Sequence, residues 1–322
     1  LIVTGEPNSI FLEIFFKSLK KIKIKSPLIL ITSEKLVKLQ MAKLKFKKKI
    51  WLLNKKNLKV YKLDNNYINI IDVNYNVSNA FEKISPKSNN FIKKCFEVAF
   101  EIIKENKFKK FINGPINKKS FLKKNYLGIT EFISSKFKIE KKAMLIFNKN
   151  LSVCPLTTHV PIKNVTNQIN KKNICDKVNL IKFFYKKNFN INPKIAVLGL
   201  NPHCESVNKF NEDDKIIKPA INYLKRKKFK ISGPYSADTF FLKNNRKNYD
   251  VALGMYHDQV LTPLKTLYEY DAINITLGLP FIRVSPDHGP NEKMMGKNIS
   301  NPLSLIRAIS FLDKHWLKLK KV

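Results

Sequence analysis

The sequence predicts an α/β protein with mainly parallel sheets. Short apolar runs rich in β-branched residues alternate with longer amphipathic segments along all 322 residues, a pattern typical of strands joined by helices. Hydrophobic residues make up 44% of the chain and charged residues 26%, which excludes a disordered or collagen-like chain. At roughly 150 residues per domain, the length predicts two domains.

Five short apolar runs are predicted as buried strands, and three longer segments with apolar residues at helical spacing are predicted as helices. The strands cover residues 28–32, 151–157, 195–200, 251–255 and 273–277, and the helices cover 91–103, 216–224 and 304–312. Parallel sheets bind ligands at the carboxyl ends of their strands. Residues that directly follow a predicted strand are therefore the first candidates for a functional site.

The chain carries a large positive charge, with 61 Lys and Arg residues against 24 Asp and Glu and a formal net charge of +37. Such a surface attracts phosphates, anionic lipids and nucleic acids. The lysines recur in separate runs between apolar residues, without a motif that reads nucleic acid. We therefore interpret the charge as solvated surface and do not expect nucleic acid to be the main partner.

The sequence gives no sign of secretion or of membrane insertion. The four cysteines have no CxxC pairing, as in a reducing cytoplasm. The opening residues lack the basic region of a signal peptide, and no stretch reaches the roughly 20 apolar residues that span a bilayer. We expect a cytoplasmic protein with no membrane partner.

Three of the five histidines occupy equivalent positions in the predicted fold. His159, His203 and His257 each lie just past the end of a predicted strand. Three neutral imidazoles at one sheet edge would form a metal site with open positions for substrate. Because the histidines are far apart in the chain, a structural role for each one is the alternative.

Lys265, Asn274 and Arg283 recur at intervals of nine outside the lysine runs. Arg283 offers a planar fork and Lys265 a compact charge, both suited to a carboxylate or phosphate, and simple solvation is the alternative. Residues 113–118 and 285–289 form turn-like segments. Neither GxGxxG nor GxxxxGK[ST] occurs, so a nucleotide would bind through another loop arrangement.

Nine motifs between about residue 5 and about residue 310 recur in the order found in the 4-hydroxythreonine-4-phosphate dehydrogenase family, which the chain resembles. They are Gly5-Glu-Pro7, Gly114-Pro-Ile-Asn-Lys118, Thr130-Glu-Phe132, Thr157-Thr-His-Val-Pro161, Gly199-Leu-Asn-Pro-His203, Ala237-Asp-Thr239, Met255-Tyr-His-Asp-Gln259, Leu277-Gly-Leu-Pro-Phe281 and Ser285-Pro-Asp-His-Gly289.

This resemblance implies an isocitrate/isopropylmalate dehydrogenase-like fold, with two α/β/α domains flanking an active-site cleft. The first domain would comprise residues 1–128 and 280–322, and the second residues 129–279. The family is homodimeric, with the active site at the subunit interface. It uses NAD⁺ or NADP⁺ and a divalent cation (Zn²⁺, Mg²⁺ or Co²⁺) to oxidise 4-phosphooxy-L-threonine in pyridoxal 5′-phosphate biosynthesis, and the product then decarboxylates.

The resemblance also implies roles for individual residues. By position, the metal ligands are His159, His203 and His257, drawn from both subunits, and the substrate-binding residues are Thr130, Lys265, Asn274 and Arg283. We assign Asp238 as a proton acceptor or as a partner of a metal ligand, with a helix N-cap as the alternative. Lys265 is also a catalytic candidate, and Gly278, Asp287 and Gly289 are candidates for the cofactor site.

The chain departs from the family pattern at several positions. Ile129 replaces the histidine that normally precedes Thr130, which removes a substrate contact. Cys204 and Glu205 follow His203 in place of small residues, and the Cys204 thiol could compete for zinc. Residues 9–13 and 290–293 also differ. The alternatives are therefore a sister enzyme acting on 4-phospho-D-threonate or 4-phospho-D-erythronate, and a decayed scaffold that binds nucleic acid.

Overall fold

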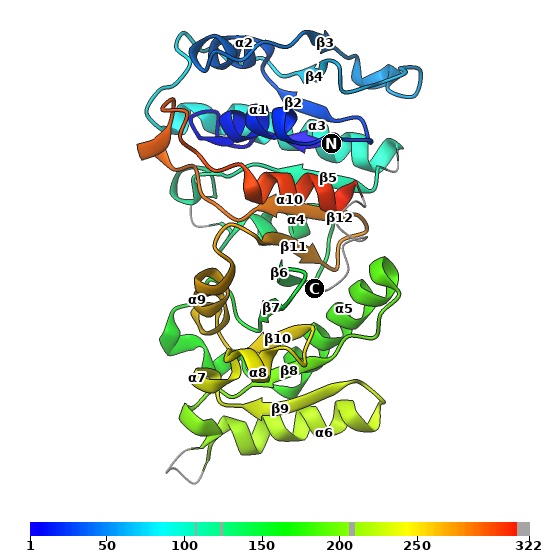
Figure 1. Ribbon diagram of the computed structural model, residues 1–322, viewed down its shortest axis with the longest axis vertical. Coiled ribbons are helices and arrows are strands. Elements are labelled where there is room, and N and C mark those ends of the chain that lie inside the picture. Colours follow the sequence, from blue (N-terminus) through cyan, green and yellow to red (C-terminus); the bar gives the residue numbers. More distant parts are fainter. Residues whose placement is uncertain (107, 123–124, 206–209, 314–322) are drawn as a thin grey trace. The chain divides into compact units, whose positions relative to one another are not determined.

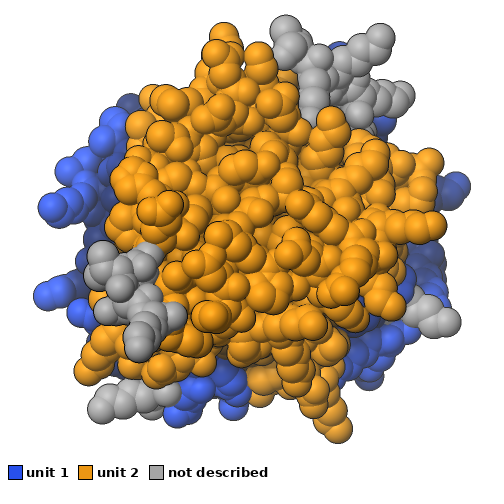
Figure 2. Space-filling model, turned by 90° about the horizontal axis from the view of Figure 1, so that it is seen from below, with its two compact units in different colours: residues 1–129, 280–320 blue, residues 130–279, 321–322 orange. Residues whose placement is uncertain are grey.

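The computed structural model describes residues 1–106, 108–122, 125–205 and 210–313. The chain divides into two compact units, coloured separately in Figure 2: Leu1–Ile129 with the segment from Pro280 onward, and Thr130–Leu279. Each unit has a sheet with helices packed on it (Figure 1), which confirms the predicted α/β class. No helix in the described ranges is long and apolar enough to cross a membrane.

The sheet of the first unit is parallel throughout, in the order β3-β4-β2-β1-β5-β12. Its strands are β1 (Ile2–Val3), β2 (Ile29–Thr32), β3 (Ile50–Leu52), β4 (Ile68–Asp72), β5 (Lys110–Asn113) and β12 (Ile282–Pro286). Its helices are α1 (Phe11–Lys21), α2 (Glu34–Lys43), α3 (Asn89–Asn106) and α10 (Leu303–Leu312).

The connections of the first unit cover both faces of its sheet. From β1 to β2 the chain moves across the sheet in one direction, and from β4 to β5 it moves in the other. Because such crossovers are right-handed, α1 and α3 lie on opposite faces, and α10 packs beside α1 (Figure 1). With both faces covered, the central strands are largely apolar, and all four residues of β2 are buried.

The second unit has a mixed sheet in the order β11-β6-β7-β10-β8-β9. Only β6 is antiparallel to its neighbours, so the other five strands end at the same edge. The strands are β6 (Ala143–Phe147), β7 (Ser152–Pro155), β8 (Ile195–Leu198), β9 (Ile231–Tyr235), β10 (Val251–Gly254) and β11 (Ile273–Leu277). The helices are α4 (Ile129–Lys136), α5 (Lys171–Phe189), α6 (Lys218–Arg226), α7 (Ala237–Phe240), α8 (Lys243–Arg246) and α9 (His257–Tyr268).

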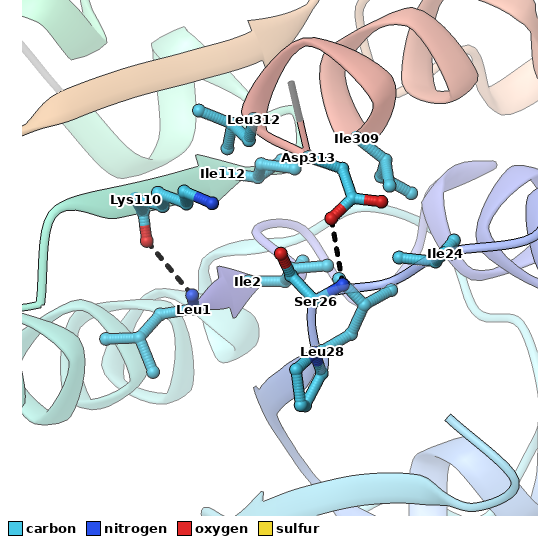
Figure 3. A pocket seen from close by; sticks show the side chains of 11 residues that line it. Leu1, Ile2, Ile24, Ser26, Leu28, Lys110, Ile112, Ile309, Leu312 and Asp313 are labelled. Carbon is cyan, nitrogen blue, oxygen red and sulfur yellow. Dashed lines mark hydrogen bonds between the residues drawn. The ribbon is translucent and has the colours of Figure 1, made fainter. Parts of the chain in front are cut away.

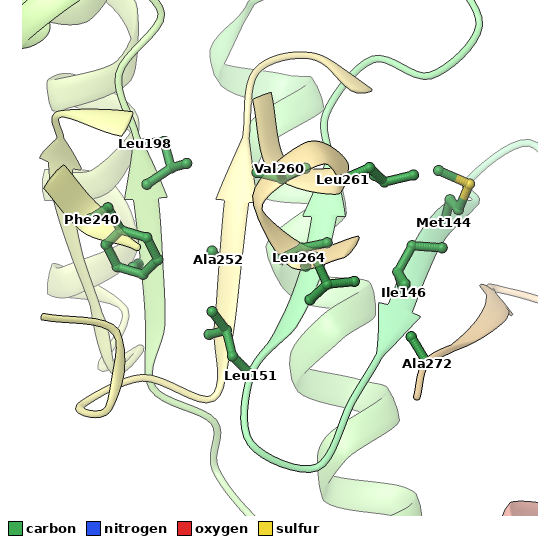
Figure 4. Packing of buried hydrophobic residues seen from close by; sticks show 12 residues of the cluster. Met144, Ile146, Leu151, Leu198, Phe240, Ala252, Val260, Leu261, Leu264 and Ala272 are labelled. Atoms are coloured by element: carbon green, nitrogen blue, oxygen red, sulfur yellow. The ribbon is translucent and has the colours of Figure 1, made fainter. Parts of the chain in front are cut away.

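Helix α9 connects the core of the second unit with the edge where its strands end. Val260, Leu261 and Leu264 are buried and belong to a hydrophobic cluster with residues of β7 and β10 (Figure 4). His257 is the first residue of the same helix and lies on the same side as Val260 and Leu264. Because α9 begins shortly after the end of β10, His257 lies at the strand ends, about one helical turn before the residues that cover the core.

The predicted elements are present, within two or three residues at their ends. The five predicted strands correspond to β2, β7, β8, β10 and β11, and the three predicted helices to α3, α6 and α10. Seven further strands of the described chain were not predicted. β1 and β3 have only two and three residues, and runs of that length carry too little periodicity to be identified from sequence. β4, β5, β6, β9 and β12 are as long as the predicted strands, so their length does not account for the omission.

Candidate active site

Three predicted metal ligands follow three neighbouring strands of the second unit. Strands β7, β10 and β8 are adjacent and parallel, and His159, His257 and His203 follow their carboxyl ends in that order. The ring centroids of His159 and His257 are 5.8 Å apart, with an angle of 38° between the planes. The fold thus brings together two histidines that are distant in the sequence.

The distance between these rings is close to that of two imidazoles bound to one ion. With metal–nitrogen distances of about 2.1 Å and a tetrahedral angle, the two ring centroids would be about 5 Å apart. His203 is exposed, and among the residues the structure describes no three His, Cys, Asp or Glu side chains form a group that could hold a metal ion. The described chain therefore brings two candidate ligands together, and His203 does not form a group of three with them.

A hydrogen bond to Asp258 selects the tautomer of His257. Nδ1 of His257 lies 2.6 Å from Oδ1 of Asp258. Because a carboxylate can only accept, Nδ1 carries the proton, and in the neutral ring Nε2 keeps its lone pair. A histidine whose second nitrogen donates to a carboxylate is typical of metal sites, so His257 fits a metal ligand that binds through Nε2.

Asp238 is exposed in the first turn of α7. A hydrogen bond with the Ser236 side chain, the Thr239 backbone N–H at 2.8 Å and the charge of His203 together hold the pKa of Asp238 below its usual range. Asp238 is therefore an ionised acceptor within electrostatic reach of His203, and its role as a proton acceptor or as a partner of a metal ligand stays a prediction.

The loop that carries His203 is anchored by the fully buried Asp213. The Asp213 carboxylate accepts hydrogen bonds from the backbone N–H groups of Leu200 at 2.9 Å and Asn201 at 3.1 Å. His203 and Cys204 have φ values of 55° and 60°, which non-glycine residues rarely adopt. Burial raises the pKa of the Cys204 thiol, which disfavours the thiolate that would bind zinc.

The predicted substrate residues of the second unit lie on α4, β11 and α9. Thr130 Oγ1 in the first turn of α4 is 3.4 Å from Thr276 Oγ1, and Asn274 lies two residues before Thr276 on the same face of β11. Oδ1 of Asn274 is buried and has no hydrogen-bond partner among the described residues, a costly state that a donating ligand would relieve. Lys265 is exposed on α9. Thr276 was not predicted, although alternation along β11 places it beside Asn274.

Arg283 belongs to the first unit and is completely buried there. Its Nε donates to Oδ1 of Asn113 at 2.7 Å, and the Asn113 amide donates to the carbonyl of Gly114 at 2.8 Å. This contact joins the last residue of β5 to the interior of β12, and because the two strands are parallel neighbours their following loops lie at the same edge. The two turn-like segments of the sequence therefore lie at one edge of this sheet.

Glu6 lies at the same edge, directly after β1, and was not predicted as a site residue. It is buried, and its carboxylate accepts hydrogen bonds from the Asn8 backbone at 3.3 Å and the Ser88 hydroxyl at 3.1 Å. Burial raises the pKa of Glu6 to about 7 against these two hydrogen bonds, and the charge of Glu292 adds to the rise. A carboxyl group that titrates near neutrality at a strand end is typical of functional sites.

The candidate cofactor residues have different surroundings. Gly278 has φ of +96°, and a Cβ there would lie 2.2 Å from the Lys141 carbonyl oxygen, so the backbone itself requires glycine. A Cβ at Gly289 would meet nothing within 4 Å among the described residues. The Asp287 backbone N–H donates to the Ser304 hydroxyl at 2.8 Å. A cofactor role for these three residues stays a prediction.

A pocket of about 50 Å³ lies at the opposite edge of the first unit's sheet, where strands β1, β2 and β5 begin (Figure 3). Its lining is largely apolar, with side chains such as Ile2, Ile112 and Leu312. The Leu1 ammonium donates to the Lys110 carbonyl at 3.0 Å. Because ligands of parallel sheets bind at the other edge, this pocket is separate from the candidate residues of the unit.

Comparison with known proteins identifies the family. The profile of the family described as pyridoxal phosphate biosynthetic protein PdxA matches residues 23–312. The 4-hydroxythreonine-4-phosphate dehydrogenase of Sulfurihydrogenibium sp. (strain YO3AOP1) is 37% identical over 96% of this chain and 95% of that protein. The one of Aquifex aeolicus is 33% identical over 97% and 96%.

Solved structures agree with this result. The crystal structure of 4-hydroxythreonine-4-phosphate dehydrogenase from Klebsiella pneumoniae superimposes with a TM-score of 0.82 at 25% identity, covering 98% of both chains. With a matched profile, full-length relatives and a shared fold, the chain belongs to the PdxA family of pyridoxal phosphate biosynthetic proteins.

Proposed function

We propose that this chain oxidises the C3 hydroxyl of 4-phosphooxy-L-threonine with NAD⁺ or NADP⁺. The product, 2-amino-3-oxo-4-phosphooxybutanoate, loses CO₂ to give 3-amino-2-oxopropyl phosphate, a step of pyridoxal 5′-phosphate biosynthesis. Membership of a dehydrogenase family supports the reaction class. The observation that carries the proposal is the convergence of His159 and His257, 5.8 Å apart, at the ends of neighbouring strands.

We propose that His159, His257 and His203 hold one divalent cation, Zn²⁺, Mg²⁺ or Co²⁺. A divalent cation at this position would lower the pKa of an alcohol bound to it. Asp258 keeps Nε2 of His257 available by accepting a hydrogen bond from Nδ1. We assign Asp238, whose lowered pKa reflects in part the charge of His203, to accept the proton of the substrate hydroxyl or to orient that histidine.

The substrate's anionic groups define the roles of the remaining residues. We assign Lys265 and Arg283 to the carboxylate and phosphate ends of the substrate, because both side chains are cations suited to such groups. Oδ1 of Asn274, which has no partner among the described residues, can accept a hydrogen bond from a substrate donor, and Thr130 contacts Thr276, two residues further along the same face of β11. Gly278, Asp287 and Gly289 are proposed to contact the nicotinamide cofactor, which accepts the hydride.

We also propose a homodimer with the site at the subunit interface. Within the described chain His203 does not complete a group of three ligands with His159 and His257, as expected if the partner subunit supplies one of them.

We propose that the protein is cytoplasmic. The four cysteines, Cys95, Cys154, Cys175 and Cys204, are free, which fits a reducing cytoplasm.

A second candidate is a sister enzyme of the same family that acts on 4-phospho-D-threonate or 4-phospho-D-erythronate. The observation that favours it is Ile129, which lacks the hydrogen-bonding group that the family pattern places before Thr130. A relative from Oceanobacillus iheyensis, 32% identical over 71% of this chain, is provisionally named a D-threonate 4-phosphate dehydrogenase.

The decisive experiment measures NADH or NADPH formation with each of the three phosphorylated substrates, before and after treatment with a chelator. Turnover of 4-phosphooxy-L-threonine that disappears with the chelator and returns with Zn²⁺, Mg²⁺ or Co²⁺ supports the proposal. Preference for either sugar-acid phosphate supports the second candidate. Absence of turnover with all three, together with DNA binding at low salt, would instead support a decayed scaffold.

The ligand assignment is tested separately by metal titration of His159→Ala, with His288→Ala as the matched control. We expect the first variant to lose high-affinity Co²⁺ binding and the second to retain it. His288 belongs to the first unit, whereas β7, β8 and β10 belong to the second. Equal binding by His159→Ala and the unmodified protein would refute the assignment.

A further inference from the structure

The side-chain amide of Gln259 bridges two strand ends that carry candidate metal ligands. Its Oε1 accepts a hydrogen bond from the Met255 backbone N–H at 2.7 Å. Its Nε2 donates to the Gly199 carbonyl oxygen, also at 2.7 Å. Met255 directly follows β10, and Gly199 directly follows β8. One side chain therefore connects the segment that leads to His257 with the loop that leads to His203.

The same connection extends to the third strand. The Thr157 hydroxyl donates to the Met255 carbonyl at 2.8 Å, and the Thr157 backbone N–H donates to the same oxygen at 3.2 Å. Thr157 lies two residues before His159. A continuous path of hydrogen bonds thus runs from the loop after β7 through Met255 and Gln259 to the loop after β8.

Two glycines, Gly254 and Gly199, lie beside the hydrogen bonds of Gln259, at positions where any larger residue would collide with neighbouring atoms. A Cβ at Gly254 would lie 2.9 Å from Oε1 of Gln259 and 2.4 Å from Cγ1 of Val260. A Cβ at Gly199 would lie 2.6 Å from the Cys204 sulfur and 2.7 Å from Oδ1 of Asp213. Glycine at the ends of both β10 and β8 therefore allows the helix start and the His203 loop to approach closely.

The His203 loop also needs external support because its backbone is unfavourable. His203 and Cys204 are consecutive non-glycine residues with positive φ, and such conformations persist only when their surroundings impose them. The side chains of Asp213 and Gln259 bond to its backbone near its start: Asp213 accepts from the Leu200 and Asn201 N–H groups, and Gln259 donates to the Gly199 carbonyl. The Tyr235 carbonyl also accepts from the Gly199 N–H at 2.9 Å. Of these three groups, Gln259 is the one that also bonds to Met255, at the strand end that leads to His257.

We propose that Gln259 is a positioning residue that fixes the His203 loop relative to His257 and so sets the metal affinity of the enzyme. This inference rests on the proposed metal site, and it holds whichever subunit's site His203 completes. Metal ligands must be placed within about 0.5 Å for tight binding. Loss of a residue that orients ligands typically lowers metal affinity 10- to 100-fold.

Two substitutions separate the two hydrogen bonds of Gln259. Gln259→Glu keeps an acceptor for the Met255 N–H but removes the donor to Gly199 and places an oxygen against its carbonyl. Gln259→Leu removes both bonds. The matched control is Gln40→Leu in the first unit, where the Gln40 amide likewise joins two segments by donating to the carbonyls of Pro7 at 3.0 Å and Ala80 at 2.9 Å.

The experiment titrates the full-length apoprotein with Co²⁺ and records both the dissociation constant and the visible absorption spectrum. Thermal unfolding of each apoprotein is measured alongside, and titrations are made well below the unfolding midpoint. We expect Gln259→Glu to weaken Co²⁺ binding 10- to 100-fold and to alter the spectrum. Gln40→Leu should lower the midpoint and leave affinity and spectrum unchanged.

Each outcome decides the inference. Unchanged Co²⁺ affinity and spectrum in both Gln259 variants would overturn it, and so would an equal loss of affinity in Gln40→Leu. If Gln259→Leu does not fold, Gln259→Glu alone decides, because it is nearly isosteric. Absence of Co²⁺ binding by the unmodified protein would overturn the metal site itself, a result distinct from altered binding in the variants only.

Discussion

Replacement of Glu6 by Gln should change how the stability of the first unit depends on pH. In the folded protein burial raises the pKa of Glu6 from 4.5 to about 7, so the folded state binds this proton more tightly than the unfolded chain does. Stability is therefore highest when the group is protonated in both states, below about pH 4.5. It falls as the pH rises toward about 7, where the folded state must also lose the proton.

The size of the expected change in the free energy of unfolding follows from the shift in the pKa of Glu6. Each unit corresponds to about 1.4 kcal/mol, so the rise from 4.5 to about 7 predicts that the unmodified protein loses about 3 kcal/mol relative to Glu6→Gln over this interval. The glutamine retains an oxygen acceptor for the Asn8 N–H, and the Ser88 hydroxyl can accept from its amide. The difference between the two proteins therefore reports the ionisation of Glu6, because their other titrating groups are the same.

The assay is urea unfolding at fixed ionic strength between pH 4.5 and 8, followed by the fluorescence of Trp51 on β3 of the same unit. A companion variant, Ser88→Ala, removes a hydrogen bond that lowers the pKa of Glu6 and should move the midpoint of the pH dependence upward. Parallel stability curves for the unmodified protein and Glu6→Gln would refute the assignment of a raised pKa to this carboxyl group.

Three further predictions concern the second unit and the substrate. Asn274→Ala should raise KM for the phosphorylated substrate about 10- to 100-fold, the effect of losing one hydrogen bond to a charged group, without changing Co²⁺ affinity; an unchanged KM would remove Asn274 from the substrate site. Ile129→His should lower KM for the substrate that the enzyme uses, and steady-state kinetics showing no change would mean that the pocket is built differently. Gly278→Ala should lower the free energy of unfolding, measured in urea, by about 2 kcal/mol or more. The reason is that φ is +96° and that a Cβ at this position would lie 2.2 Å from the Lys141 carbonyl oxygen. A stability equal to that of the unmodified protein would contradict this prediction.

Local pattern was sufficient for eight of the elements, all of them apolar runs or amphipathic segments. The strand predicted at residues 273–277 has the bounds of β11, and the helix predicted at 91–103 lies within α3. β6 was not predicted, although it is a uniform apolar run. Its antiparallel direction could not have been predicted, because the direction of a strand depends on its partner and leaves no mark on its own residues. His159, His203 and His257 were also identified from local pattern, because each of them follows an apolar run.

Residue types and their places at strand ends were thus determined by the sequence alone. Only the tertiary structure decided that β7, β10 and β8 are neighbours, and so which histidines meet. It also decided that Gln259 reaches Gly199 and that Glu6 is buried with a raised pKa. The physical reason is that periodicity and turn chemistry are encoded over a few residues, whereas burial, hydrogen-bond partners and ligand distances arise from segments brought together only when the sheet forms.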